Sequence, residues 1–407
     1  MKIVQINAVY KASSTGRTTL EMHNALRTMG HESYVFCCNK HNPVDNVFRV
    51  GCLLDHKIHA LCSRIFGLQG YFSFMATRRL ITHLRSISPD IVILRNLHNN
   101  YVNFPMLLKY LEGAGCGVID VLHDCWSFTG HCSYYTKQNC SKWQKECQNC
   151  QYLSEGNKSY FFDNSLAIFR MKRRRFSKLK NLAVVGVSKW ITNEAKKSPI
   201  FDNAKLIIPI YNWINLEVFK PREASELRTK LNIALNQFVV LGVSQGWSPQ
   251  KGLLNFISIA KRMPDIMFVM VGNMAKNMTL PSNIISIPPT SSIDELCQYY
   301  SMADVFLNFS VQETFGKVTA EAVSCGTPVI VNDATATPEL CGEGCGYIIH
   351  NNDEDAAISA IKIIESKGKG NYTDKCRKFA VDNFDMGKGI EKYMQVFQQL
   401  HGFKDKP

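Results

Sequence analysis

Residues 304–333 read DVFLNFSVQETFGKVTAEAVSCGTPVIVND. They comprise an apolar strand, a polar loop, a helical stretch and a second apolar strand. Both strands are continuous apolar runs, which is typical of a sheet covered on its two faces. A helix that connects two such strands leaves them parallel. The stretch therefore predicts a doubly wound α/β sheet.

The same pattern recurs along the whole chain. The apolar runs of the first half are KIVQINAV, SYVFCC, DIVILRNL, VIDVLHD, LAVVGVS and LIIPI, and those of the second half are QFVVLGVS, IMFVMVG, NIISIPP, DVFLNFS, PVIVND and GYIIH. Two series predict two doubly wound domains, with a boundary in YNWINLEVFKPREASEL, where Pro221 and charged residues follow the last strand of the first half. We expect domains at 1–215 and 216–385, and a C-terminal helix at 386–407 that packs back on the first domain.

Composition excludes several classes of protein. The chain has 407 residues, of which 45% are hydrophobic and 20% charged, as in ordinary globular proteins. No run approaches the ~20 apolar residues of a membrane-spanning helix. The first residues, MKIVQINAVY, lack the apolar core of a signal peptide, so we expect a cytoplasmic protein whose 15 cysteines are reduced. A secreted disulfide scaffold is excluded.

The net charge of +13 lies in the first half. Residues 1–210 hold 28 basic and 13 acidic residues, a net charge of +15, and residues 211–407 hold 19 and 21. Unless this is merely a solvated basic face, it indicates an anionic partner: a phospholipid surface, a phosphorylated substrate or nucleic acid.

The densest basic segment runs from Arg170 to Lys180, with seven cations in eleven residues. A basic helix laced with aromatic residues binds anionic membrane surfaces, so this run predicts either a membrane contact or a solvated helix face. The apolar anchors expected beside it are Phe161, Phe162, Phe169 and Phe176.

Ligands of open α/β sheets bind beyond the carboxyl ends of the strands. After the first strand, the small residues of loop 12–17, Gly16 among them, lead into a helix whose amides suit an anion, although small residues also simply make tight turns. The loop is not a G-x-G-x-x-G fingerprint, and the chain has no Walker motif. Dinucleotide enzymes and P-loop NTPases are therefore excluded.

The second half carries the stronger signal. Lys251-Gly252 follows the strand QFVVLGVS, Glu313 lies in the loop after DVFLNFS, and Glu321 lies two turns into the next helix, before G-T-P-V. A lysine and a helix N-terminus stabilise the negative charge on a departing diphosphate. Glu321 is suited to accept both ribose hydroxyls of a nucleotide, and Glu313 to accept hydroxyls of a transferred sugar.

These motifs resemble the retaining, nucleotide-sugar-dependent glycosyltransferases of family 4, and the resemblance covers essentially the whole chain. The phrase HDCWSFTGHC at 123–132 is similar to the colanic acid and exopolysaccharide branch. The resemblance implies the GT-B fold, in which two Rossmann-like doubly wound domains face a central cleft. It also implies transfer without a settled protein nucleophile, and we expect no catalytic metal.

The resemblance assigns roles residue by residue. At the reacting centre we expect His123, in a positioning role, with Asp124 and Glu313. We expect His98 and Tyr101 to contact the acceptor. Donor binding is assigned to Gly16, Lys251, Thr314, Phe315, Gly316 and Glu321.

The chain departs from the family pattern at one position. Most members carry an arginine five residues before the lysine, where this chain has Gly246 followed by Trp247. A tryptophan here is usual in the exopolysaccharide branch. Another basic residue therefore substitutes, or Lys251 and the helix dipole act alone.

A cysteine-rich insertion is expected at about 125–155. Its cysteines at 132, 140, 147 and 150 include the knuckle C-Q-N-C and form a set of four thiolates that suits one structural zinc. The spacing does not distinguish zinc from an iron–sulfur cluster, and buried free thiols or disulfides are the other interpretations.

We therefore expect a hexosyltransferase-type enzyme that moves a sugar from a UDP- or GDP-sugar to a lipid-linked oligosaccharide in exopolysaccharide, capsule or O-antigen synthesis. It would work peripherally on the inner face of the membrane, without nucleic acid. The alternatives are a basic, zinc-containing nucleic-acid-binding protein, which leaves Lys251, Glu313 and Glu321 without a role, and a GT-B sugar phosphorylase.

Overall fold

A computed structural model describes residues 1–39, 42–275, 278–290 and 292–402. The chain forms two compact units: unit 1 is Met1–Ile210 with the chain from Ile390 onward, and unit 2 is Tyr211–Gly389. The boundaries expected from sequence, after residues 215 and 385, lie close to these divisions. Among the described residues, no helix has both the length and the apolar character needed to cross a bilayer.

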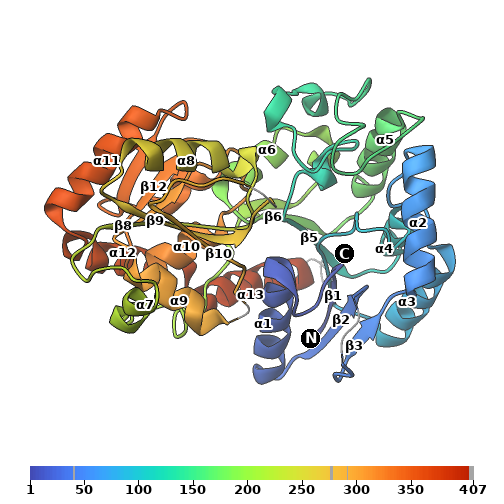
Figure 1. The fold of residues 1–407 in the computed structure, drawn as a ribbon. Coiled ribbons are helices and arrows are strands. Elements are labelled where there is room, and N and C mark those ends of the chain that lie inside the picture. The colour runs from blue at the N-terminus through green and yellow to red at the C-terminus, as the bar shows by residue number, and fades with distance from the viewer. Residues whose placement is uncertain (40–41, 276–277, 291, 403–407) are drawn as a thin grey trace. The chain divides into compact units, whose positions relative to one another are not determined.

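Unit 1 is built on a seven-stranded parallel sheet in the order β3-β2-β1-β4-β5-β6-β7 (Figure 1). Its central strands are fully buried, which is why their sequences are unbroken apolar runs. The strands are β1 (Lys2–Ile6), β2 (Glu32–Cys37), β3 (Val47–Arg49), β4 (Ile91–Leu94), β5 (Gly117–Leu122), β6 (Leu182–Gly186) and β7 (Leu206–Pro209).

Helices connect these strands, as parallel pairing requires. Between β5 and the next long helix, the predicted insertion contains three short 3-10 helices, Trp126–Phe128, Thr136–Gln138 and Lys142–Gln144. The helices of unit 1 are α1 (Ser13–Thr28), α2 (Leu53–Phe66), α3 (Phe74–Ile87), α4 (Phe104–Leu111), α5 (Ser165–Phe176), α6 (Lys189–Ala195) and, from Ile390 onward, α13 (Met386–Gly402).

Unit 2 is built on a six-stranded parallel sheet in the order β10-β9-β8-β11-β12-β13 (Figure 1). Its strands are β8 (Val239–Gly246), β9 (Met267–Asn273), β10 (Ile284–Ile287), β11 (Val305–Asn308), β12 (Val329–Asn332) and β13 (Gly346–Ile349). Its helices are α7 (Ser225–Lys230), α8 (Leu253–Arg262), α9 (Ile293–Met302), α10 (Lys317–Ser324), α11 (Glu354–Lys367) and α12 (Gly370–Phe384).

The strand orders confirm the predicted doubly wound fold. Every apolar run predicted as a strand forms one, and the sequence misses only the three-residue edge strand β3 among the described strands. The order reverses between β1 and β4 in unit 1 and between β8 and β11 in unit 2. Ligands bind at such switch points because the loops beyond neighbouring strands diverge there.

α5 carries most of the basic run, yet it packs into the core of unit 1. Phe169, Lys172 and Phe176 are each 0% exposed. The ammonium of Lys172 lies 3.4 Å from the ring centroid of Trp126, and burial lowers its pKa to about 7. The prediction that Phe169 and Phe176 anchor a membrane helix is therefore wrong, because both rings are buried in the core of unit 1.

Two of the four arginines of α5 are also paired with glutamates within the unit. Arg170 bonds to Glu146 at 2.6 Å, and Arg175 bonds to Glu112 at 2.9 Å. These ion pairs neutralise part of the positive charge that the sequence assigns to a membrane contact.

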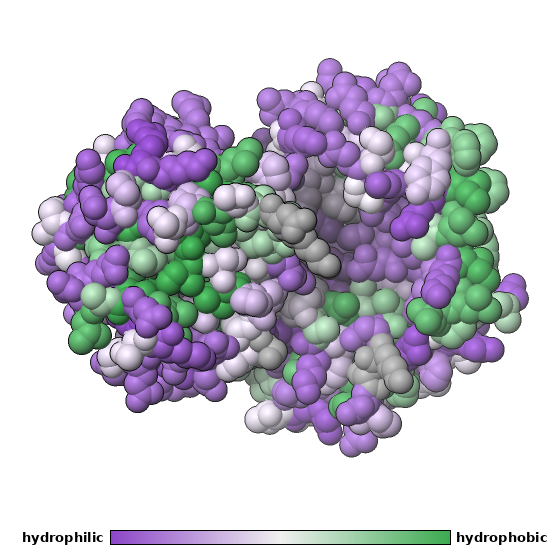
Figure 2. Space-filling view, in the orientation of Figure 1, coloured by the Kyte–Doolittle hydropathy of each residue, from purple (hydrophilic) through white to green (hydrophobic). Residues whose placement is uncertain are grey.

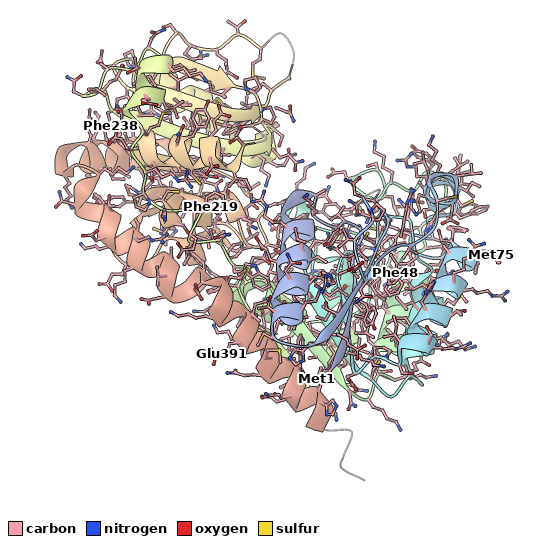
Figure 3. The ribbon with its side chains drawn as sticks, turned by 90° about the horizontal axis from the view of Figure 1, so that it is seen from below. Met1, Phe48, Met75, Phe219, Phe238 and Glu391 are labelled. Carbon is pink, nitrogen blue, oxygen red and sulfur yellow. The ribbon has the colours of Figure 1, made fainter. Side chains whose placement is uncertain are left out.

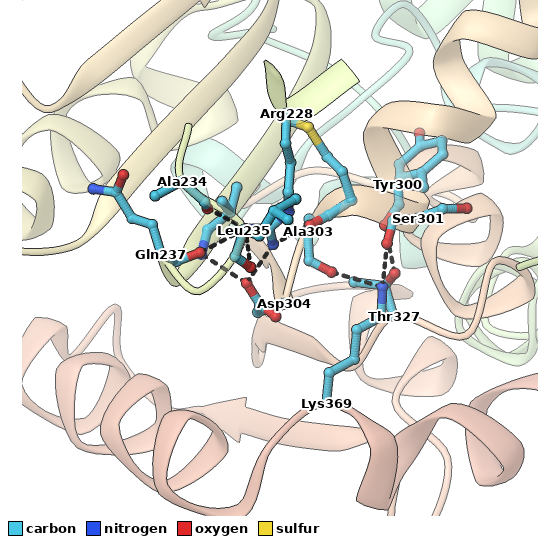
Figure 4. Close-up of polar contacts among 12 residues, drawn as sticks. Arg228, Ala234, Leu235, Gln237, Tyr300, Ser301, Ala303, Asp304, Thr327 and Lys369 are labelled. Atoms are coloured by element: carbon cyan, nitrogen blue, oxygen red, sulfur yellow. Dashed lines mark hydrogen bonds and ion pairs between the residues drawn. The ribbon is translucent and has the colours of Figure 1, made fainter. Parts of the chain in front are cut away.

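In unit 2, Arg228 and Lys369 hold the segment that leads into β11 (Figure 4). The Arg228 guanidinium donates to the carbonyls of Gln237 and Met302 at 2.7 and 2.6 Å and to the Asp304 carboxylate at 3.0 Å. The Lys369 ammonium donates to two more carbonyls of the same segment, at 2.6 and 2.7 Å. Burial lowers the pKa of Lys369 to about 8.

Replacing this buried arginine should destabilise unit 2. We expect Arg228→Met to lower the free energy of unfolding by about 2–4 kcal/mol, because it leaves Asp304 and several buried carbonyls without their donor. Urea unfolding measures the loss. Arg262→Met is the control, since that side chain is 43% exposed and should cost under about 1 kcal/mol. Equal losses in the two variants would contradict the role of Arg228.

Candidate active site

In unit 2, a tight turn after β8 carries Lys251. The turn packs on the end of β11 because Gly252 has no side chain: a Cβ there would lie 2.3 Å from the Cβ of Phe309. Gly252 also has a φ of 74°, which favours glycine. The backbone N–H of Val311 donates to the carbonyl of Gln250 at 3.0 Å and joins the turn to the loop after β11.

This arrangement brings Lys251 and Glu313 together. The Lys251 ammonium donates to the Glu313 carboxylate at 2.5 Å, and their side chains are 36% and 17% exposed. The backbone N–H of Glu313 donates to the Thr335 hydroxyl at 2.9 Å, which ties the loop to the segment that follows β12. The two residues predicted to meet the diphosphate and the sugar therefore form one ion pair at the switch point of the sheet.

Glu321 lies inside α10, the helix that follows this loop. It is 5% exposed, and the hydroxyl of Tyr300 donates to its carboxylate at 3.0 Å. Tyr300 comes from the last turn of α9, and no pattern in the sequence marks it as a partner of Glu321. The bond fixes the orientation of a carboxylate that is almost fully buried.

The residues between the two glutamates are mainly structural. Phe315 is 3% exposed, and its ring centroid lies 6.0 Å from that of Tyr211 and 5.6 Å from that of Phe384. Thr314 is 8% exposed. Gly316 has a φ of 93° and leads into α10. Only their backbone groups therefore suit the predicted donor contact.

The residue directly after the position of the missing arginine packs into unit 2. The indole N–H of Trp247 donates to the carbonyl of Val271 at 3.2 Å, and its ring centroid lies 5.5 Å from that of Phe256. Gly246 is exposed, with open space where a side chain would begin. Trp247 therefore packs against β9 and α8 and adds no charge to the site.

In unit 1, His123 follows β5 and is 9% exposed. Its Nε2 lies 3.0 Å from Nη1 of Arg95, the residue directly after β4. A guanidinium only donates, so Nε2 accepts and His123 is neutral with its proton on Nδ1. Burial lowers the pKa of Arg95. Arg95 is not among the site residues predicted from the sequence. The signal that could have found it is a charged residue directly after a buried strand at the switch point.

His98 and Asp124 form the second pair of unit 1. The imidazole Nε2 of His98 lies 2.7 Å from the Asp124 carboxylate, and their side chains are 13% and 15% exposed. Burial raises the pKa of Asp124, but the charge and hydrogen bond of His98 and the backbone N–H of Trp126 outweigh burial and lower it. Asp124 is therefore an ionised anchor for His98.

Tyr101 and Gly16, both predicted to contact ligands, are instead packed against other parts of unit 1. Tyr101 is 0% exposed and donates its hydroxyl to the carbonyl of Asn96 at 3.2 Å. This corrects the expectation that Tyr101 contacts an acceptor, because its hydroxyl is enclosed. Gly16 lies in α1, where a Cβ would be 3.2 Å from the backbone N of Lys11, so glycine here permits close packing of helix and loop.

Two family models match the chain. Glycosyltransferase Family 4 matches residues 15–218, half of the chain, and Glycosyl transferases group 1 matches residues 223–382. The chain belongs to glycosyltransferase family 4. Its two doubly wound parallel sheets are the predicted GT-B architecture of that family.

Relatives of this family 4 chain match parts of it. The alpha-galactosylglucosyldiacylglycerol synthase of Streptococcus pneumoniae is 31% identical over 139 residues, 30% of this chain and 37% of the synthase. An uncharacterized 41.2 kDa protein in the cps region of Klebsiella pneumoniae is 25% identical over 197 residues, 46% of this chain and 54% of that protein. The chain thus spans less than two thirds of the length of either relative.

Solved structures match the whole fold. A glycosyltransferase from Rickettsia africae superposes with a TM-score of 0.69 at 15% identity, over 100% of this chain and 99% of that one. HepE of Anabaena, in complex with UDP and glucose, superposes with a TM-score of 0.66 at 16% identity, over 98% and 99%. At these identities the likeness shows the fold.

The cysteine-rich insertion of this family 4 chain brings its four thiols near one another. Burial, and then the thiols of Cys150, Cys147 and Cys140, raise the pKa of Cys132. Backbone N–H groups donate to the sulfurs of Cys147 and Cys150, at 3.2 and 3.4 Å. All four are free, and across the described ranges no group of three Cys, His, Asp or Glu side chains is arranged to hold a metal ion.

Zinc at these thiols stays a prediction. Protein purified without added metal should carry about one equivalent of zinc by elemental analysis, as a site of four thiolates requires. Cys147→Ser with Cys150→Ser should abolish it, and Cys52→Ser, at an exposed cysteine, should not. Protein without zinc or iron whose four thiols titrate in the native state would contradict the prediction.

Proposed function

We propose that this family 4 chain is a hexosyltransferase that moves a sugar from a nucleotide diphosphate donor to an acceptor with retention of configuration. The observation that carries the proposal is the 2.5 Å ion pair of Lys251 and Glu313 at the switch point of unit 2, with Glu321 in the helix that follows.

The ion pair suggests how unit 2 receives its donor. A diphosphate competes with Glu313 for the Lys251 ammonium, because two phosphate groups offer it more negative charge than one carboxylate does. Once released, Glu313 accepts hydroxyls of the sugar. Glu321, already oriented by Tyr300, accepts the ribose hydroxyls. The lysine then stabilises the charge that grows on the leaving diphosphate.

Unit 1 contributes positioning groups. Neutral His123, held by Arg95, offers Nδ1–H or its backbone carbonyl to a sugar hydroxyl. The oxygens of Asp124 accept from His98 and from the Trp126 backbone, which makes Asp124 a poor nucleophile. A mechanism in which the acceptor attacks the face that the diphosphate leaves needs no protein nucleophile and agrees with these surroundings.

The proposed substrates are a UDP- or GDP-sugar and a lipid-linked oligosaccharide acceptor in exopolysaccharide, capsule or O-antigen synthesis, at the inner face of the membrane. HepE, solved with UDP and glucose, supports the donor. The relatives named for a diacylglycerol glycolipid and for a cps region support the acceptor and its setting.

Conservative variants of the glutamates test the donor site. Glu321→Gln should weaken UDP or GDP binding by about 10- to 100-fold, because it removes hydrogen bonds to a charged acceptor. Glu313→Gln should chiefly lower turnover. Isothermal titration calorimetry and a donor-hydrolysis or transfer assay measure the two effects. The control is Glu343→Gln, an exposed glutamate of the same unit. Wild-type affinity and turnover in both variants, with every donor tested, would overturn the assignment.

A further inference from the structure

Helix α2 in unit 1 is amphipathic, but its polar side faces the core and its apolar side faces outward. Its buried residues are His59 and Ser63, both polar. A surface helix of a globular protein normally turns its apolar stripe to the core. Here the apolar side chains point outward: Leu53 is 62% exposed, Leu54 66%, Ile58 52% and Leu61 57%.

Hydrogen bonds hold α2 in this orientation. Nδ1 of His59 lies 2.8 Å from the hydroxyl of Ser73, and that hydroxyl donates to the Asp55 carboxylate at 2.8 Å. A second histidine, His56, bonds through Nε2 to the carbonyl of Val50 at 2.8 Å. Rotating α2 so that the apolar stripe faced inward would break this network. The outward stripe is therefore a built feature.

The apolar surface continues beyond the end of α2. The rings of Phe66 and Phe162 stack with centroids 6.5 Å apart, and the N–H of Tyr160 donates to the Arg64 carbonyl at 2.8 Å. Phe161, on the same loop, is 73% exposed. Figure 2 shows hydrophobic residues along the edge where Figure 1 places α2 and α3.

Phe74 and Met75, at the start of α3, extend this surface with exposures of 58% and 62%. Beside Met75 lies a hollow of about 340 Å³, whose lining includes Phe48, Arg79 and His83. Met75 and Phe48 are labelled in Figure 3. We call the exposed apolar residues of α2, loop 160–162 and the start of α3 the α2 face.

Basic side chains surround the α2 face. Residues 47–87 hold six basic residues and one carboxylate, Asp55, a net charge of +5. Lys57, Arg64, Arg78 and Arg79 are exposed, and none of them joins a salt bridge with another described residue. Unlike Arg170 and Arg175 of α5, these cations are available to an external anion.

We propose that the α2 face docks unit 1 on an anionic phospholipid surface. Exposed leucine, isoleucine and phenylalanine enter the boundary of headgroups and acyl chains, and the surrounding cations meet lipid phosphates. A second copy of the chain is disfavoured as the occupant, because pairing the same face would oppose two sets of unpaired cations. The inference rests on the proposed function in one respect: the membrane would supply the lipid-linked acceptor.

Co-sedimentation of the full chain with phosphatidylcholine vesicles containing about 30% phosphatidylglycerol tests the docking surface. We expect salt-sensitive binding. Ile58→Ser with Leu61→Ser should lower the partition coefficient about tenfold or more, since both side chains lose their apolar contact. The matched control is Leu235→Ser with Ile363→Ser, two exposed apolar residues of unit 2.

A second pair of variants separates the α2 face from α5. Arg78→Glu with Arg79→Glu should remove the preference for anionic vesicles. Arg173→Glu with Arg174→Glu makes the same change of charge on α5 and should keep most of that preference. All these side chains are exposed, and thermal unfolding checks that each variant is folded. Equal losses in both pairs, or no vesicle binding by the wild type, would overturn the proposal.

Two further measurements complete the test. A dimer in sedimentation velocity that Leu61→Ser dissociates, without vesicle binding, would assign the face to a second copy and overturn the proposal. The α2 variants should keep nucleotide affinity, and Glu321→Gln should keep vesicle binding. Failure of the docking proposal is thus distinguishable from failure of the proposed transferase function.

Discussion

Both sheets of this chain are parallel and covered by helices, so a polar side chain on a strand would be buried without water. The chemistry is therefore confined to the loops beyond the carboxyl ends of the strands. Lys251 and Glu313 follow β8 and β11, and Arg95 and His123 follow β4 and β5. Lys251 and Glu313 lie where the strand order of unit 2 reverses. Arg95 lies at the corresponding point of unit 1, and His123 follows the neighbouring strand. The sheets thus decide which few residues can meet a ligand.

Pairing of charges is the common feature of these loops. Lys251 is paired with Glu313, and His98 with Asp124. Each charged group therefore has a partner before any ligand arrives, which limits the cost of removing it from water. A ligand that binds must offer a better partner than the resident one. This requirement favours a diphosphate over a single weak anion and gives the proposed donor site its selectivity.

The sequence predicts the strands well because unbroken apolar runs can only be buried. It also predicts which loops carry Lys251, Glu313 and His123, since these residues directly follow such runs. It could not assign Tyr101, Phe169 or Phe176, because an aromatic residue near charged residues looks the same in a core and on a membrane face. The inverted orientation of α2 depends on Ser73, which is 14 residues from His59, and the Tyr300–Glu321 bond joins different helices. Only the three-dimensional packing reveals such pairs.

Unit 1 is discontinuous in sequence, since its last helix segment begins at Ile390, after the whole of unit 2. Leu400 packs so closely on β5 that a Cβ on Gly117 would lie 2.9 Å from it, and Tyr393 interacts with Arg95. During synthesis, the strand that precedes His123 therefore lacks part of its packing until after unit 2 has left the ribosome. Unit 2 is continuous and can fold first. A peptide fused to the end of α13 would accordingly disturb unit 1 before unit 2.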